Sequence, residues 1–153
     1  MILRKLQKGQ SIIEFALVLP LFLLLLVGAC YVGVIMADYL TLSSIARSSA
    51  REASVKVTET EYKQNGYKIV YKNYEDKKLP VDIFNWNPKD HRNDFKITYE
   101  NNSQNVKVEI KAALNKDGYG YKLAKVVDGL AGSDMKNMEL RVTYSMYSEN
   151  KLQ

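Results

Sequence analysis

The chain has 153 residues, a net charge of +5 and 46% apolar residues, with one cysteine and one histidine. These numbers exclude an intramolecular disulfide and any metal cluster that needs several histidines from one chain. No block of Lys and Arg follows the first third of the chain, so the charge does not favour a nucleic-acid partner.

An uncharged apolar run occupies residues 15–37. At about 1.5 Å per residue, a helix of this length crosses about 30 Å of hydrocarbon. The apolar core of a secretory signal is shorter, about 7–15 residues. The run therefore predicts one membrane-spanning helix.

A short basic head precedes the span and supplies Arg4, Lys5 and Lys8. Lys and Arg at one end of the first span favour the cytoplasmic side for that end. We therefore expect a single-pass protein with its N-terminus inside and the body after Ala37 outside.

Glu14 lies between this head and the uncharged run. A carboxylate deep in hydrocarbon costs about 2.5–3.5 kcal/mol, so it has a partner, a use or a place at the water interface. In one interpretation Glu14 marks that interface, offset by Arg4 and Lys8. In the other, the chain is cut after Gly9, and Glu14 lies one helical turn from the new amine of Gln10. The carboxylate then pairs with its own amine or with that of a neighbour.

Residues 8–20 read KGQSIIEFALVLP. This stretch resembles the N-terminal signature of TadE-like proteins, the minor pseudopilins of tight-adherence (Tad) pili, which are distant relatives of type IV pilins. A glycine, an acid five residues later, a proline and an unbroken span coincide here. Ala46-Arg47 and Ala50-Arg51 also match, and the resemblance covers roughly the first 55 residues.

The resemblance implies a processing site at Gly9–Gln10, where a prepilin peptidase cuts on the cytoplasmic side. Glu14 becomes the fifth residue of the mature chain. The resemblance also implies a non-catalytic structural subunit of the bacterial cytoplasmic membrane, found at the cell surface once assembled into a pilus. Its implied partners are the peptidase, the major pilin, other minor pseudopilins, the assembly platform and the membrane, with no cofactor.

Two alternatives stay open. Val27-Gly28-Ala29-Cys30 is close to a lipobox, which would make the chain a lipoprotein acylated at Cys30. However, residues 31–37 are still apolar, whereas a lipoprotein becomes polar soon after its acylated cysteine. Cys30 is better explained as a small apolar residue within the helix. The other alternative is a permanently anchored extracytoplasmic binding module whose head is never cut.

Within the span, Ala29, Gly33 and Ala37 recur every four residues. Small residues at this spacing permit close helix–helix packing in lipid, although Gly and Ala are also common in membrane helices. Pro20 removes one backbone hydrogen bond and is expected to bend or locally unwind the helix.

After the span, a stripe of small and apolar residues at helical spacing predicts that the helix continues to about Val57. Arg47 and Arg51 lie one turn apart on a neighbouring face, which we interpret as solvated. The stripe consists of Leu42, Ile45, Ala46, Ser49, Ala50, Ala53 and Val57.

The body alternates apolar and polar residues, the pattern of half-buried antiparallel strands. Residues 100–104 predict a hairpin loop between two of these strands, and residues 123–130 have helical spacing closed by Gly132. The predicted strands are Lys68–Tyr74, Phe95–Tyr99, Val106–Ile110 and Leu140–Met146.

Together these patterns predict an α+β, pilin-like fold in three parts: a leader at 1–9, a transmembrane and spine helix at 10–57, and an extracytoplasmic antiparallel sheet domain with one short helix at 58–153. His91 lies in a loop rich in oxygen ligands, but their spacing does not fit an EF-hand. We expect no metal site and no enzymatic activity.

Overall fold

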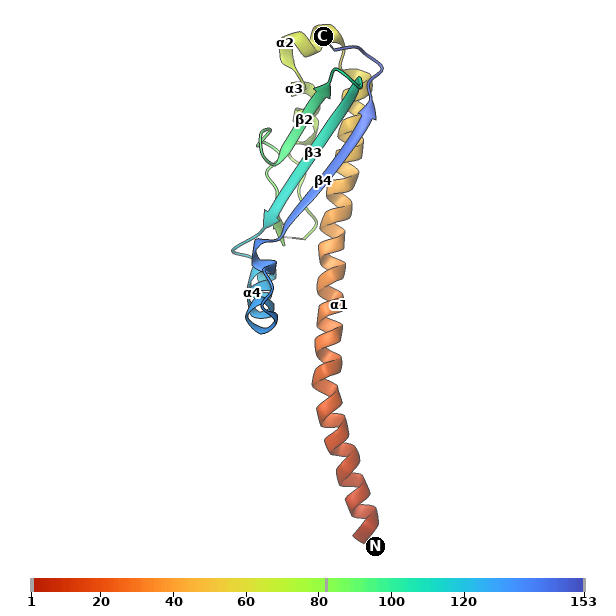
Figure 1. Cartoon of the computed structure of the whole chain (residues 1–153), viewed down its shortest axis with the longest axis vertical. Helices are drawn as coiled ribbons and strands as arrows, with labels where there is room; N and C mark the ends of the chain where they lie inside the picture. Colours follow the sequence, from red (N-terminus) through yellow and green to blue (C-terminus); the bar gives the residue numbers. More distant parts are fainter. Residues whose placement is uncertain (1, 82, 153) are drawn as a thin grey trace. The chain divides into compact units, whose positions relative to one another are not determined.

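A computed structural model describes residues 2–81 and 83–152, without the side chains of residues 2–10, 130 and 131. The elements confirm the predicted α+β fold, in which a long apolar helix precedes a small antiparallel sheet and short helices (Figure 1). The chain forms two compact units, Met1–Ile35 and Met36–Gln153. In order, the elements are α1 (Ile2–Lys56), α2 (Glu59–Asn65), α3 (Lys68–Tyr74), β1 (Phe84–Asn85), β2 (Phe95–Glu100), β3 (Asn105–Leu114), α4 (Tyr119–Ala131), the 3-10 helix η1 (Met135–Asn137) and β4 (Glu139–Tyr147).

The first unit is the N-terminal part of α1, and its apolar side chains are exposed. Every large apolar residue from Ile12 to Val27 is 39–73% exposed. Among the described residues, Ser11–Lys56 is long and apolar enough to cross a membrane, with a mean hydropathy of 2.6 in its most apolar window. A helix that is apolar on all sides requires an apolar environment, which is consistent with a single-pass membrane protein.

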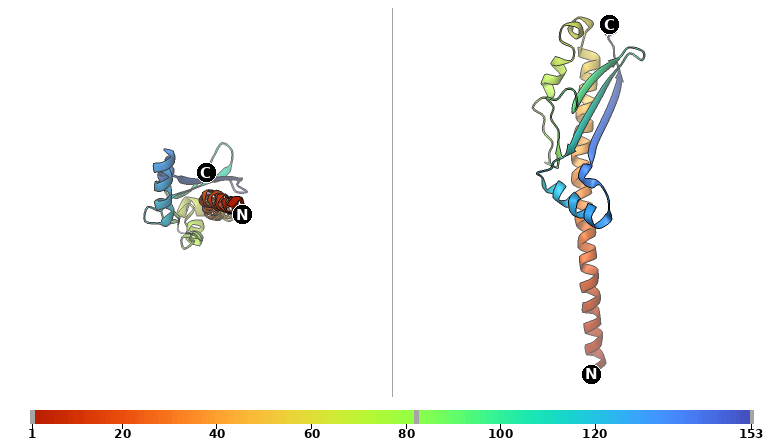
Figure 2. Two further views of the ribbon diagram at one scale, coloured as in Figure 1. Left: turned by 90° about the horizontal axis from the view of Figure 1, so that it is seen from below. Right: turned by 60° about the vertical axis from the view of Figure 1, so that its left-hand side comes forward.

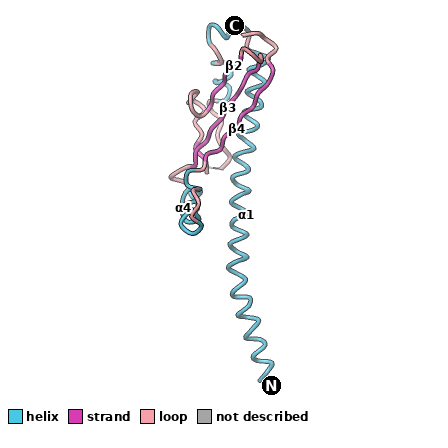
Figure 3. The backbone as a smooth tube through the Cα atoms, viewed as in Figure 1, coloured by secondary structure: helices cyan, strands magenta, loops and turns pink. Residues whose placement is uncertain are grey.

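In the second unit, β3 is the central strand of an antiparallel sheet, drawn in magenta in Figure 3. β2 and β3 form the predicted hairpin, with Glu100 paired to Asn105 beside the turn. β4 pairs with β3 from Tyr147 at one end to Glu139 at the other. The predicted strands in these three places are confirmed because their alternation reflects one buried and one solvated face.

The core of this unit lies between the sheet and the second half of α1, which run side by side (Figure 2). All seven residues of the predicted α1 stripe are buried, between 0 and 7% exposed. Arg47 and Arg51 are exposed, and the Arg47 guanidinium lies 5.7 Å from the ring centroid of Tyr144. The side chains that β3 buries are Val106, Val108, Ile110, Ala112 and Leu114.

The segment predicted as a strand at Lys68–Tyr74 is wrong: it is helix α3. Its Ile, Val and Tyr content favours a strand, but Tyr67, Val70, Tyr71 and Tyr74 are spaced three or four residues apart. That spacing puts them on one helical face. The Tyr71 hydroxyl accepts a 2.8 Å hydrogen bond from the Ile97 backbone N–H, so α3 covers the edge of β2.

Helix α2 was also not predicted. Thr58 and Glu61 form a capping box at its start: the Thr58 side chain accepts from the Glu61 N–H, and the Glu61 carboxylate accepts from the Thr58 N–H. This reciprocal pair satisfies amides that a helix N-terminus leaves open. A Thr followed three residues later by Glu is the signal in the sequence.

The C-terminal tail caps the end of α1, where helix carbonyls lack partners. The Glu149 N–H donates to the Ser54 carbonyl at 3.1 Å, and Asn150 Nδ2 donates to the Val57 carbonyl at 3.2 Å. Ser148 is buried, and its hydroxyl donates to the Asn150 carbonyl at 2.7 Å. β4 therefore ends beside the end of α1.

Candidate functional site

The predicted processing site lies within a continuous helix. Gly9 and Gln10 are inside α1, and the side chain of Gln10 is not among those that the structure describes. Glu14 is exposed. One helical turn, about 6 Å along the axis, separates Gln10 from Glu14. An amine created at Gln10 by cutting after Gly9 would therefore lie on the same helix face as the Glu14 carboxylate.

The predicted packing face in the span is open within this chain. Ala29 and Gly33 are exposed, and Ala37 is half-buried. A Cβ atom added at Gly28 or Gly33 would meet nothing within 4 Å. Among the described residues, therefore, no side chain limits the size of the residue at position 28 or 33.

Pro20 and Cys30 both lie inside α1. The helix assignment is continuous through Pro20, and the predicted bend or local unwinding at this residue stays a prediction. Cys30 is a free, exposed cysteine, and helical structure continues beyond it to Lys56.

Asp38 follows the apolar run directly, and sequence reasoning missed its role. It is fully buried, and its Oδ1 atom accepts a 3.1 Å hydrogen bond from the Val81 backbone N–H. These residues lie 43 positions apart in the sequence. Asp38 thus ties the loop before β1 to α1 at the start of the second unit, and an acid directly after an apolar span is the only sequence signal.

Replacing Asp38 with alanine is expected to lower the free energy of unfolding of the second unit by about 1.5–3 kcal/mol, because the Val81 amide loses a charged acceptor. Asp38→Asn, which keeps an acceptor oxygen, should lose less. Urea unfolding of the full chain in detergent, followed by emission of the single tryptophan, Trp86, measures both. Asp76→Ala, at an exposed acid, is the control. Equal midpoints for Asp38→Ala and this control would contradict the assignment.

In the loop around His91, the carboxylate oxygens of Asp90 accept hydrogen bonds from other groups of the same loop. Asp90 accepts hydrogen bonds from the amides of Arg92 and Asn93 and from Asn93 Nδ2. The Asn93 side chain first, and then these amides, hold the pKa of the Asp90 carboxyl below its ordinary value. His91 stacks on Tyr71, with ring centroids 3.8 Å apart. Among the described residues, no group of three or more His, Cys, Asp or Glu side chains is placed to hold a metal ion.

Four tyrosines line a groove beside β2: Tyr62, Tyr67, Tyr71 and Tyr99. Tyr67 is 5% exposed, and its buried hydroxyl has no hydrogen-bond partner in the structure. Burial, followed by the neighbouring tyrosines, raises the pKa of Tyr67 well above its ordinary value. The Tyr67 hydroxyl therefore stays protonated at neutral pH.

A comparison with known protein families finds a match in the N-terminal helix. The family model described as TadE-like protein matches residues 9–51. The matched residues include Gly9, Gln10, Glu14, Pro20 and the open face of small residues, and they end before the sheet begins. No curated protein and no solved structure matches the chain.

Proposed function

Because the family model of TadE-like proteins matches residues 9–51, we propose that the chain is a component of a Tad pilus and, within it, a minor pseudopilin. In this role the chain is a structural subunit rather than a catalyst. A prepilin peptidase cuts it after Gly9, and the cut chain is needed for pilus assembly and adhesion.

One observation carries the proposal: the motif at residues 8–20 lies in the part of α1 where every large apolar side chain from Ile12 to Val27 is exposed. Lipid covers such a helix before assembly, and neighbouring helices cover it in a fibre. The spacing of Gln10 and Glu14 gives the cut chain an amine and a carboxylate on one face. Together these features fit a subunit that moves from a bilayer into a helical assembly.

The basic head supports the orientation in this proposal. Arg4, Lys5 and Lys8 keep the N-terminus in the cytoplasm, where the peptidase acts, so the second unit lies outside. The partners in this proposal are the peptidase, the major pilin, other minor pseudopilins and the assembly platform. The second unit then presents its sheet and short helices to these subunits or to a surface.

N-terminal sequencing and intact-mass analysis of the protein purified from its own cells test the proposal. A chain that begins at Gln10 supports the pseudopilin. A chain that still begins at Met1, in cells that cut other prepilins, rejects it and leaves a permanently anchored binding module. A chain that begins at an acylated Cys30 rejects it in favour of a lipoprotein.

Replacing Gly9 with leucine is expected to lower the amount of cut chain at least about tenfold, because glycine permits a close backbone approach that a larger side chain blocks. Gly28→Leu adds the same side chain in open space and should be cut normally. Immunoblots of membranes with and without the peptidase measure both forms. Normal cutting of the Gly9→Leu chain would contradict the assigned site.

A further inference from the structure

Helix α4 exposes apolar side chains that the fold does not use. Of its described residues, only Gly120 and Ala124 are buried. Tyr119 is 89% exposed and Val126 is 58% exposed. Leu123 and Val127 are half-buried, so Tyr119 and Val126 are the large apolar side chains that this amphipathic helix leaves for another environment.

The exposed surface of α4 combines aromatic, aliphatic and cationic side chains. Tyr119, Lys122 and Val126 are exposed at intervals of three and four residues, so they form one face, and Lys125 lies beside it. The Lys122 ammonium lies 5.3 Å from the centroid of the Tyr119 ring. No acid is exposed among the described residues of α4. Tyr and Lys around an apolar strip are typical of helices at a lipid headgroup boundary.

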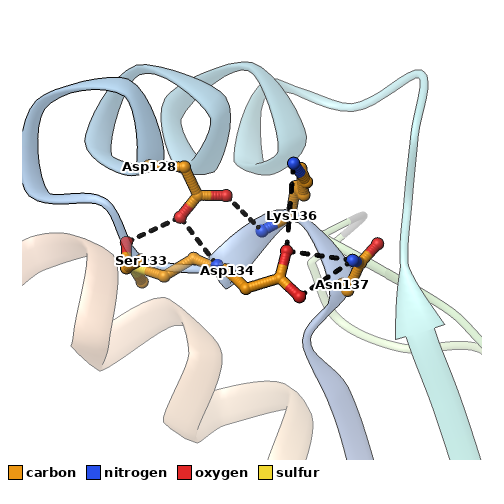
Figure 4. Close-up of polar contacts among 6 residues, drawn as sticks. Asp128, Ser133, Asp134, Lys136 and Asn137 are labelled. Carbon is orange, nitrogen blue, oxygen red and sulfur yellow. Dashed lines mark hydrogen bonds and ion pairs between the residues drawn. The ribbon is translucent and has the colours of Figure 1, made fainter.

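Both ends of α4 are fixed, so the helix cannot turn this face into the core. At its start, a Cβ atom on Gly120 would lie 2.9 Å from Ile83 Cγ2, which shows how closely the two segments pack. At its end, the Asp128 carboxylate accepts hydrogen bonds from the Ser133 hydroxyl at 2.7 Å and from the Met135 and Lys136 amides at 2.7 and 2.9 Å (Figure 4).

The hydrogen bonds of this anchor also shift the pKa of Asp128. Burial alone would raise the pKa of Asp128, but the hydrogen bonds from Ser133, Lys136 and Met135 outweigh burial and hold that pKa below its ordinary value. These hydrogen bonds therefore favour the ionised form of the Asp128 carboxylate, the form that accepts them.

Within the second unit, α4 lies at the end where the chain emerges from the apolar run. β4 and α1 end together at the Ser54–Glu149 hydrogen bond. From there back to Asp38 the helix covers about 24 Å, and from Tyr147 back to Glu139 the strand covers about 27 Å. The start of β4 therefore comes level with Asp38, and α4 lies just beyond this end of the sheet (Figure 1).

Local contacts give the same result. Asp38 binds the Val81 amide, and Ile83, two residues later, packs on Gly120 of α4. Asp38 is also the first residue after the uncharged run at 15–37. A helix linked to Asp38 through one short loop lies near the membrane surface whenever that run spans the bilayer.

We propose that α4 lies on the outer surface of the membrane, with Tyr119 and Val126 at the headgroup boundary and Lys122 and Lys125 on anionic lipid phosphates. This inference rests on the membrane insertion in the proposed function. The contact orients the second unit against the bilayer before assembly, and departure into a pilus breaks it.

Lipid contact is tested on the full chain carrying Cys30→Ser, reconstituted in bilayers of phosphatidylcholine and phosphatidylglycerol. A fluorophore is attached at Val126→Cys or, as the control, at Ser145→Cys on exposed β4. Lipid-borne nitroxide should quench the probe at position 126 at least about threefold more strongly than the probe at 145, because only the first lies among headgroups. Equal quenching in a chain that resists alkaline extraction overturns the inference alone, whereas an extractable chain overturns the proposed membrane span.

The cationic contribution is tested by Lys122→Glu/Lys125→Glu, with the exposed pair Lys68→Glu/Lys72→Glu on α3 as the matched control. Only the α4 pair should lower quenching at position 126, by about twofold or more, and only with phosphatidylglycerol present. A second copy of the chain could instead cover this face. In that case the probe at position 126 would be protected from an aqueous quencher only at a high protein-to-lipid ratio, and lipid-borne nitroxide would not quench it. That result would overturn the inference. Unchanged Trp86 emission shows that each variant is folded.

Discussion

Replacing Phe95 with alanine is expected to lower the free energy of unfolding of the second unit by about 3–5 kcal/mol, the usual cost of truncating a buried phenylalanine. Phe95 is fully buried, and its ring meets those of Tyr71, Tyr74 and Trp86 edge-on, with centroids 5.2, 6.1 and 6.0 Å apart. Edge-to-face pairs of this kind add to the stabilisation from burial alone. A small domain is stable by only about 5–15 kcal/mol, so the variant loses a large share of its stability.

Urea unfolding of the full chain in detergent, monitored by Trp86 emission, measures this loss. Tyr147→Ala is the matched control, because Tyr147 is 61% exposed and its truncation leaves no cavity. We expect the control to stay within about 0.5 kcal/mol of the parent chain, as surface substitutions usually do. A Phe95→Ala midpoint equal to that of Tyr147→Ala would show that this aromatic cluster does not form the core.

Replacing Glu14 with alanine is expected to leave cutting after Gly9 intact but to reduce pili at least about tenfold. In an assembled fibre the Gln10 amine would lie among apolar side chains, where an unpaired charge is costly. Truncating one partner of a buried charge pair costs about 2–5 kcal/mol, and every 1.4 kcal/mol is about a tenfold change in binding. Loss of the carboxylate therefore weakens each subunit contact strongly.

The subunit recovered in the sheared pilus fraction, together with the mass of the membrane-bound form, separates assembly from cutting. Ser11→Ala, one turn before Phe15 in the same part of α1, is the control and should assemble normally. Glu14→Asp keeps a carboxylate and should restore part of the piliation. Normal piliation of the Glu14→Ala strain would return Glu14 to the simpler role of marking the water interface.

The sequence predicted those parts of the fold in which a local period sets which face is buried. Alternation gave β2, β3 and β4, and the helical stripe from Leu42 to Val57 gave the half of α1 that packs on the sheet. The helix ended by Gly132 was also predicted, and the backbone there has a φ of 65°, which glycine adopts without strain.

The prediction from sequence was wrong where residue composition favoured a strand and residue spacing favoured a helix. The Ile, Val and Tyr content of α3 favoured a strand, but the spacing from Tyr67 to Tyr74 formed a helix because that helix buries Val70 and places Tyr71 against the edge of β2. In the candidate site, the predicted processing motif and Glu14 could be recognised from the sequence because they lie within one or two helical turns of each other. Asp38 was not readable as an anchor because its partner, Val81, is distant in the sequence.

The sequence by itself determined the apolar run, its basic head, the position of Glu14 relative to Gly9, and the three strands β2, β3 and β4, because each depends on residues close together along the chain. Only the tertiary structure decided that Asp38 is buried, that the C-terminal tail caps α1, and that α4 keeps Tyr119 and Val126 exposed. Burial and hydrogen bonding depend on which distant segments meet, and no local period records that meeting.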